Sequence, residues 1–220
     1  MKLKLTIITL FMLAISSFAQ NAEDIVNKNI EVTGGEKAWN NLNSIILKGE
    51  VSLDVDNTLP MIVYHKRPYL KRVAFVMNNK EILNEGYDGT NGWTYSDILK
   101  KNVVVPNYQP DAFDSDLLMY KKKGFKLKYI GEETVEGIDC YKISLQKNKN
   151  FIYFYFDKKT YNLIAEDNKD EKLIYSNFKK INGLQFAMKI VGKPKEGGEY
   201  VVYFSEIKIN PNISDKFFKF

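Results

Sequence analysis

Side chains that could carry out chemistry are few and scattered in this sequence. The only histidine is His65, beside Lys66 and Arg67, and no Cys, Asp or Glu cluster stands near it at the spacing of a metal site. The sequence has no nucleophile elbow, no glycine-rich phosphate loop that opens a helix and no HExxH helix. We therefore expect no catalytic residue, no metal and no cofactor, and we expect His65 to be a structural or surface residue.

Aromatic and methionine side chains on predicted strand faces are the more distinctive pattern. Trp93 and Tyr95 follow the turn pair Asp88-Gly89 and share one face of an extended strand, because they are two residues apart. Such apolar faces suit a ligand cavity with few polar groups. The expected cavity wall consists of Phe75, Met77, Trp93, Tyr95, Phe113, Leu117, Tyr153 and Met188. The simpler alternative is that each of these residues only fills the hydrophobic core.

Short strands of alternating pattern must position these residues. Turn pairs such as Asn182-Gly183 separate the strands, which predicts a single antiparallel meander, and a sheet this long must curl or close. The expected fold is mainly β with helices (α+β), a curved antiparallel sheet that forms an incomplete barrel wrapped around a few helices. The predicted strands span residues 44–54, 61–66, 69–77, 82–87, 92–95, 102–105, 126–134, 138–146, 151–157, 163–168, 172–179, 184–191 and 200–210.

Helices are predicted at three places. An amphipathic pattern over residues 21–30 ends at Gly34-Gly35, and residues 36–42 suit a second short turn of helix with Trp39. Residues 111–123 begin with acids and end with lysines, which matches the helix dipole. We expect this third helix to present Phe113 and Leu117 to the sheet.

The first nineteen residues have the pattern of a secretory signal peptide, with a basic start, a short apolar run and small residues before the cut after Ala19. Gln20 stands where a lipidated protein would need cysteine, so we expect an exported periplasmic protein without a lipid anchor. Residues 20–220 should form a single domain. Cys140 is the only cysteine, which excludes an intrachain disulfide and suits a small buried hydrophobe.

The charge is mildly basic and evenly spread. Loss of Lys2 and Lys4 with the signal peptide would lower the formal charge from +5 to +3. Nucleic-acid-binding surfaces show a clustered basic stripe, which this sequence lacks. We therefore expect no nucleic-acid partner.

Four short motifs occur in order along the chain. They are Lys66-Arg67-Pro68, Asp88-Gly89 followed by Trp93-x-Tyr95, the hairpin Val135–Lys142, and Ile209-Asn210-Pro211 followed by Ile213, Asp215 and Phe218. In type and spacing they resemble motifs of the periplasmic lipoprotein carriers of the LolA/LolB type, especially exported relatives described as outer membrane lipoprotein-sorting proteins. The chain departs from that pattern at Ser96-Asp97, where the carriers usually have Asn-Pro.

The resemblance implies an incomplete barrel that helices close off, with an apolar cavity for lipoprotein acyl chains. In the carriers, the arginine of the K-R-P motif holds a helical lid shut through hydrogen bonds to backbone carbonyls, so Arg67 is the candidate lid lock. A guanidinium suits this role because its five donors can engage several carbonyls at once. The alternative is that Arg67 is an ordinary surface residue beside the free strand end that Pro68 creates.

The sequence therefore supports a non-enzymatic periplasmic carrier that binds lipoprotein acyl chains or other lipid for transfer towards the outer membrane. Transport proteins of the inner and outer membranes would be its partners, and we expect a monomer. Two alternatives remain. One is a sensor or scaffold of the same fold that binds a protein partner on its concave face. The other is an enzyme acting on a lipid or cell-wall substrate, which would need a polar cluster inside the cavity.

Overall fold

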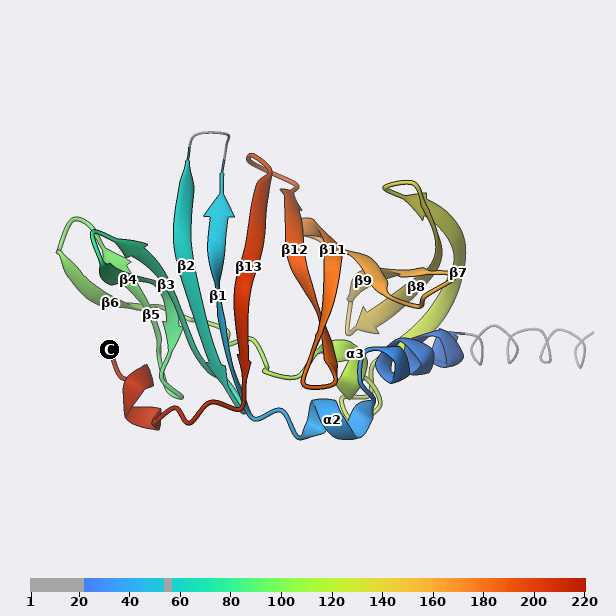
Figure 1. The fold of residues 1–220 in the computed structure, drawn as a ribbon, viewed down its shortest axis with the longest axis horizontal. Helices are drawn as coiled ribbons and strands as arrows, with labels where there is room; N and C mark the ends of the chain where they lie inside the picture. The colour runs from blue at the N-terminus through green and yellow to red at the C-terminus, as the bar shows by residue number, and fades with distance from the viewer. Residues whose placement is uncertain (1–21, 54–56) are drawn as a thin grey trace, which may run out of the picture.

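Thirteen antiparallel strands in one open sheet make up most of the described part of the chain (Figure 1). The structure is a computed structural model that describes residues 22–53 and 57–220. The predicted signal peptide, residues 1–19, lies outside the described residues. No helix within these ranges is long and apolar enough to cross a membrane.

The strands form two meanders that meet in the middle of the sheet. The first strand of the chain pairs with the last, so the two free edges of the sheet are β6 and β7. Each predicted strand overlaps one observed strand, which confirms the strand prediction. The strands are β1 (Ser44–Ser52), β2 (Thr58–Lys66), β3 (Leu70–Met77), β4 (Lys80–Tyr87), β5 (Gly92–Ser96), β6 (Lys101–Val105), β7 (Lys126–Val135), β8 (Ile138–Lys147), β9 (Asn150–Asp157), β10 (Leu163–Asp167), β11 (Glu171–Ile181), β12 (Leu184–Pro194) and β13 (Tyr200–Ile209).

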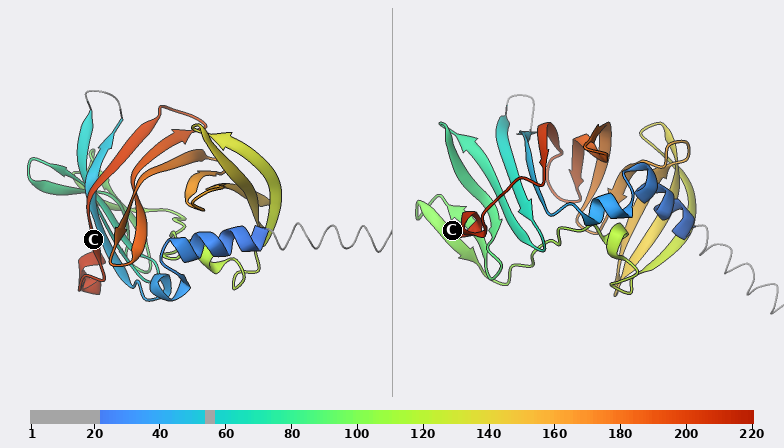
Figure 2. Two further views of the ribbon diagram at one scale, coloured as in Figure 1. Left: turned by 45° about the vertical axis from the view of Figure 1, so that its right-hand side comes forward. Right: turned by 60° about the horizontal axis from the view of Figure 1, so that its bottom comes forward.

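Helical segments are short and lie mostly together at one end of the curved sheet (Figures 1 and 2). They comprise residues 22–32, α2 (Glu36–Asn40), α3 (Asp116–Met119) and the 3-10 helix η1 (Asp215–Phe218). The sheet is open, and the helices occupy one end of its curve. The link from β6 to β7, residues 106–125, joins the two opposite edges and carries α3 along this end.

The prediction of a helix over residues 111–123 is wrong in length, because only Asp116–Met119 is α-helical. Ser115 is the N-cap and its side chain accepts a hydrogen bond from the Leu118 amide. Residues before Ser115 are held in a non-helical conformation by the first meander. The Phe113 amide donates to the Pro68 carbonyl at 3.0 Å. Asp111 and Asp114, two of the acids that suggested a helical first turn, instead pair with Lys71 of β3 and with Arg67, which follows β2.

Apolar residues of the helices and the link pack on one face of the sheet. Ile25 and Val26 form one cluster with Leu117 of α3 and with Ile143 and Phe154 of the sheet. A second cluster joins α2 to β1, β12 and β13. Side chains alternate along β9, so Tyr155 belongs to a third cluster on the opposite face. Cys140 lies in that third cluster with only 1% exposed, as predicted for a small buried hydrophobe.

The central pairing of β1 with β13 contains a register shift between Lys48 and Gly49. A Cβ atom at Gly49 would lie 2.0 Å from the carbonyl oxygen of Tyr203 in β13. Because that obstacle is backbone, it cannot rotate away. Glycine at this position therefore allows the two meanders to join.

We predict that Gly49→Ala lowers the free energy of unfolding by about 1–3 kcal/mol, the usual range for an overpacked site. Urea denaturation would measure the change. Gly198→Ala is the matched control, because nothing lies within 4 Å of a Cβ there and its φ is not positive. Equal stability of the two variants would contradict the steric explanation.

Candidate functional site

A cavity of about 850 Å³ lies between the sheet and the segments at its covered end. This volume falls within the range of small-molecule sites. Helix 22–32, α2, the β6–β7 link and several strands all contribute to the lining. The apolar part of the wall includes Ile30, Trp39, Phe113, Leu117, Phe154 and Phe186.

One part of the lining is charged, which the sequence patterns did not indicate. Asp116 at the start of α3 accepts hydrogen bonds from Lys147 at 2.5 Å and from Lys123 at 3.0 Å. Glu166 and Tyr175 come from β10 and β11, and the Tyr175 hydroxyl donates to the Glu166 carboxylate at 3.5 Å. The cavity therefore combines an apolar wall with a polar cluster.

Two of the predicted wall residues, Phe113 and Leu117, line this cavity. Met188 is buried in the core cluster beneath α2, and it is not among the lining residues of the described chain. Tyr153 packs on the opposite face of β9, where Lys142 lies 5.1 Å from its ring centre. The prediction that Tyr153 lines the cavity is therefore wrong. Tyr153 and Phe154 are neighbours in β9 and point to opposite faces of the sheet, and Phe154 lines the cavity.

The other four predicted wall residues belong to the first meander and are not among the lining residues of the described cavity: Phe75, Met77, Trp93 and Tyr95. Met77 is half exposed. Trp93 donates its indole N–H to Asp88 at 3.0 Å, and its ring lies 6.3 Å from that of Phe220. The C-terminal segment thus covers this aromatic side chain, which a strand pattern alone cannot reveal.

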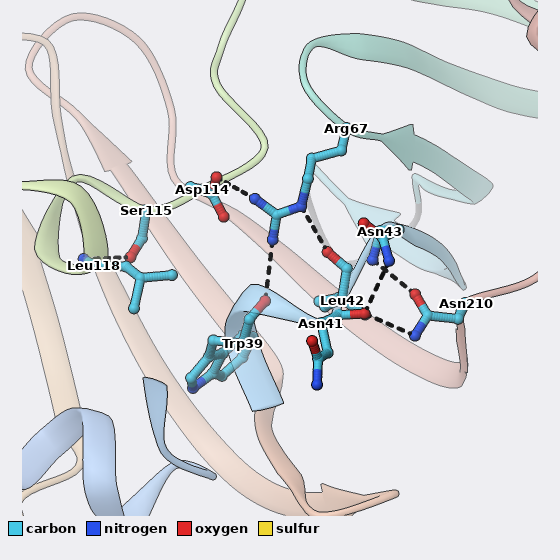
Figure 3. Close-up of polar contacts among 9 residues, drawn as sticks. All are labelled: Trp39, Asn41, Leu42, Asn43, Arg67, Asp114, Ser115, Leu118 and Asn210. Carbon is cyan, nitrogen blue, oxygen red and sulfur yellow. Dashed lines mark hydrogen bonds and ion pairs between the residues drawn. The ribbon is translucent and has the colours of Figure 1, made fainter. Parts of the chain in front are cut away.

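Arg67 joins three segments at the covered end of the sheet (Figure 3). Its Nε donates to the Leu42 carbonyl at 2.9 Å, and its Nη2 donates to the Trp39 carbonyl at 3.0 Å. The Trp39 carbonyl lies in the last turn of α2 and also accepts from the Leu42 amide at 3.1 Å, whereas Leu42 follows the C-cap residue Asn41. The third guanidinium nitrogen pairs with Asp114 in the β6–β7 link. The guanidinium also lies 4.9 Å from the ring centre of Phe113, a cavity residue.

Asn210 provides a second attachment for the segment that follows α2 (Figure 3). Its side-chain oxygen accepts from the Asn43 amide at 2.7 Å, and its side-chain nitrogen donates to the Asn41 carbonyl at 3.1 Å. The Ser44 hydroxyl donates to the Pro211 carbonyl at 2.8 Å. The Asn-Pro motif near the end of the chain thus fixes the entry into β1.

His65 lies in the cavity wall with its ring 4.9 Å from that of Phe113. Burial, together with the nearby Lys71 ammonium, lowers the pKa of His65 to about 4, so the imidazole is neutral at neutral pH. Its Nε2 is buried without a hydrogen-bond partner among the described residues. Within those residues, no cluster of three or more His, Cys, Asp or Glu could hold a metal ion.

We predict that Arg67→Leu loosens α2 while leaving the sheet folded. Amides of residues 38–42 should exchange with deuterium roughly tenfold faster, as expected for the loss of charge-assisted hydrogen bonds worth about 1.5 kcal/mol. Hydrogen–deuterium exchange with mass spectrometry would measure this change.

Arg72 is the only other arginine, which makes Arg72→Leu the matched control. Its guanidinium lies 4.7 Å from the ring centre of Phe217 and 5.5 Å from that of Phe220. This variant should loosen residues 217–220 and leave α2 unchanged. Faster exchange of the α2 amides in both variants, or in neither, would contradict the assignment of Arg67 as the residue that holds α2 in place.

Comparison with known proteins rests on structure alone, since no family model and no curated protein matches the sequence. An outer membrane lipoprotein-sorting protein domain from Vibrio parahaemolyticus is similar, with a TM-score of 0.61 and 13% identity over 91% of this chain and 97% of that one. A DUF1329 family protein from Desulfovibrio piger has a TM-score of 0.62 and 15% identity over 92% and 97% of the two chains.

A third similar structure is a LolA superfamily protein from Nitrosomonas europaea. It has a TM-score of 0.57 and 14% identity, over 90% of this chain and 97% of that one. These likenesses extend over nearly the full length of each relative, and they confirm the resemblance inferred from the four motifs at the level of the fold. The protein therefore has the fold shared by the LolA superfamily and by outer membrane lipoprotein-sorting domains.

Proposed function

We propose that this protein is a periplasmic carrier that binds the acyl chains of a lipoprotein or another lipid in the cavity described above, for transfer towards the outer membrane. The observation that carries the proposal is the cavity of about 850 Å³ with an aromatic and aliphatic wall. The fold it shares with lipoprotein-sorting and LolA superfamily proteins supports the same conclusion. Release to an acceptor would involve transport partners at the inner and outer membranes.

The apolar wall suits hydrocarbon because burial is the main source of affinity for an acyl chain. Each buried methylene contributes about 0.8 kcal/mol. Ten such groups would contribute roughly 8 kcal/mol before the costs of binding are subtracted. Such a wall needs no catalytic group. Lys123 and Lys147 of the polar cluster are paired with Asp116, and the proposed carrier is non-enzymatic.

Arg67 would control access by holding α2 and the β6–β7 link together. Both segments line the cavity, and Arg67 bonds to both of them. A bulky cargo that separates these segments competes with the Arg67 bonds, so the empty protein favours the closed arrangement and the loaded protein an open one. Closure would then assist release.

We predict that the protein binds a fluorescent fatty acid and that Ala112→Trp weakens this binding at least tenfold. Ala112 belongs to the β6–β7 link and lines the cavity, so a large side chain there occupies space that the ligand needs. Fluorescence titration would measure both proteins. Mass spectrometry of the natively purified protein should also detect bound lipid.

Thr90→Trp is the control, because Thr90 is exposed in the β4–β5 turn and is not among the lining residues of the described chain. It should bind the probe as wild type does. Absence of bound lipid together with absence of probe binding by wild type would overturn the proposed function. Equal binding by the two tryptophan variants would place the lipid elsewhere.

A further inference from the structure

Carboxylates that line the cavity differ in whether a basic side chain neutralises them. The lining includes Asp111, Asp114, Asp116 and Glu166. Each of the three aspartates forms an ion pair, with Lys71, Arg67 and the pair Lys123 and Lys147, respectively. Glu166 forms no ion pair with any lysine or arginine of the described chain, and it accepts only the long hydrogen bond from Tyr175.

A β-bulge places Glu166 on the cavity side of the sheet. The pairing of β10 with β9 shifts between Leu163 and Ala165, so Leu163 and Glu166 face the same side although they are three residues apart. Glu166 pairs with Phe154 of β9, and both residues line the cavity. Ala165 instead belongs to the cluster on the opposite face.

The surroundings of Glu166 disfavour an isolated negative charge. Burial and the nearby Asp116 carboxylate raise the pKa of Glu166 above its usual value. The hydrogen bond from Tyr175 and the Lys147 ammonium lower the pKa of Glu166, but their effects are smaller than that of burial. A cation that reached Glu166 through the cavity would relieve this unfavourable burial.

We propose that Glu166 selects for an amphiphile whose polar end carries a cationic amine, with the hydrocarbon chain against the apolar wall. This inference rests on the proposed function, because it assigns a head-group site to the same cavity. The ammonium would form an ion pair with the Glu166 carboxylate, and the Tyr175 hydroxyl would remain beside it. Phe154, opposite Glu166 on β9, would begin the apolar path for the chain.

Three probes with the same chain and different heads test the selection: dodecylamine, dodecanol and dodecanoate. Isothermal titration calorimetry at neutral pH would measure their dissociation constants with wild type, Glu166→Gln and Glu171→Gln. Glutamine keeps the size of the side chain and removes its charge. Glu171 is the matched control, since it also accepts a tyrosine hydroxyl, from Tyr200 at 2.8 Å, but is not among the lining residues of the described chain.

Wild type and Glu171→Gln should bind dodecylamine roughly tenfold more tightly than dodecanol, and Glu166→Gln should lose this preference. Dodecanoate should bind wild type most weakly. Equal binding of the three probes by wild type, or an amine preference that persists in Glu166→Gln, would overturn the selection by Glu166 and leave the carrier function standing. Failure of wild type to bind any probe would overturn both. The comparison of probes on wild type does not depend on the folding of a variant.

Discussion

The described chain forms one open sheet of thirteen strands, and only a few short helical segments and one link are available to cover its apolar concave face. Because β1 pairs with β13, the edges β6 and β7 lie at opposite ends of the strand order, and the chain between them must travel from one edge to the other. That link carries α3 and joins residues 22–32 and α2 at one end of the curve. The cavity follows from this constraint, since a few short segments cover the face without filling it.

The short segments that cover the sheet are stabilised by contacts with other parts of the chain. A helix of five residues such as α2 is not stable in isolation, because the free-energy cost of nucleating a helix exceeds the stabilisation from the hydrogen bonds of one turn. Arg67 and Asn210 satisfy carbonyls at its C-terminal end and beyond. Under the proposed function, the α2 part of this cover would open when these polar bonds break, while the strand pairing of the sheet stays intact. This separation of a stable sheet from a detachable cover suits a protein that must both enclose and release a ligand.

Strand positions could be predicted because alternation and turn pairs are local signals, as for Asn182-Gly183 between β11 and β12. The cavity wall was only partly predictable, because which strand face is covered depends on distant segments. Trp93 lies near Phe220, which the alternation around Trp93 cannot show. Glu166 was not predicted to line the cavity, because the bulge in β10 breaks the alternation from which its strand face would be inferred. Arg67 was identified through resemblance to a motif, and its partner carbonyls became visible only in the structure.

The rate at which a bound fluorescent fatty acid leaves the protein for lipid vesicles tests the central role of Arg67 most directly. Stopped-flow measurements would compare wild type with Arg67→Leu and Arg72→Leu. If the Arg67 bonds favour the closed, empty protein, they compete with the bound ligand. Loss of these bonds should stabilise the loaded protein relative to the empty one, so Arg67→Leu should release the probe several-fold more slowly than the other two proteins. Equal release rates for all three proteins would contradict the assignment of Arg67 as the residue that closes the cavity.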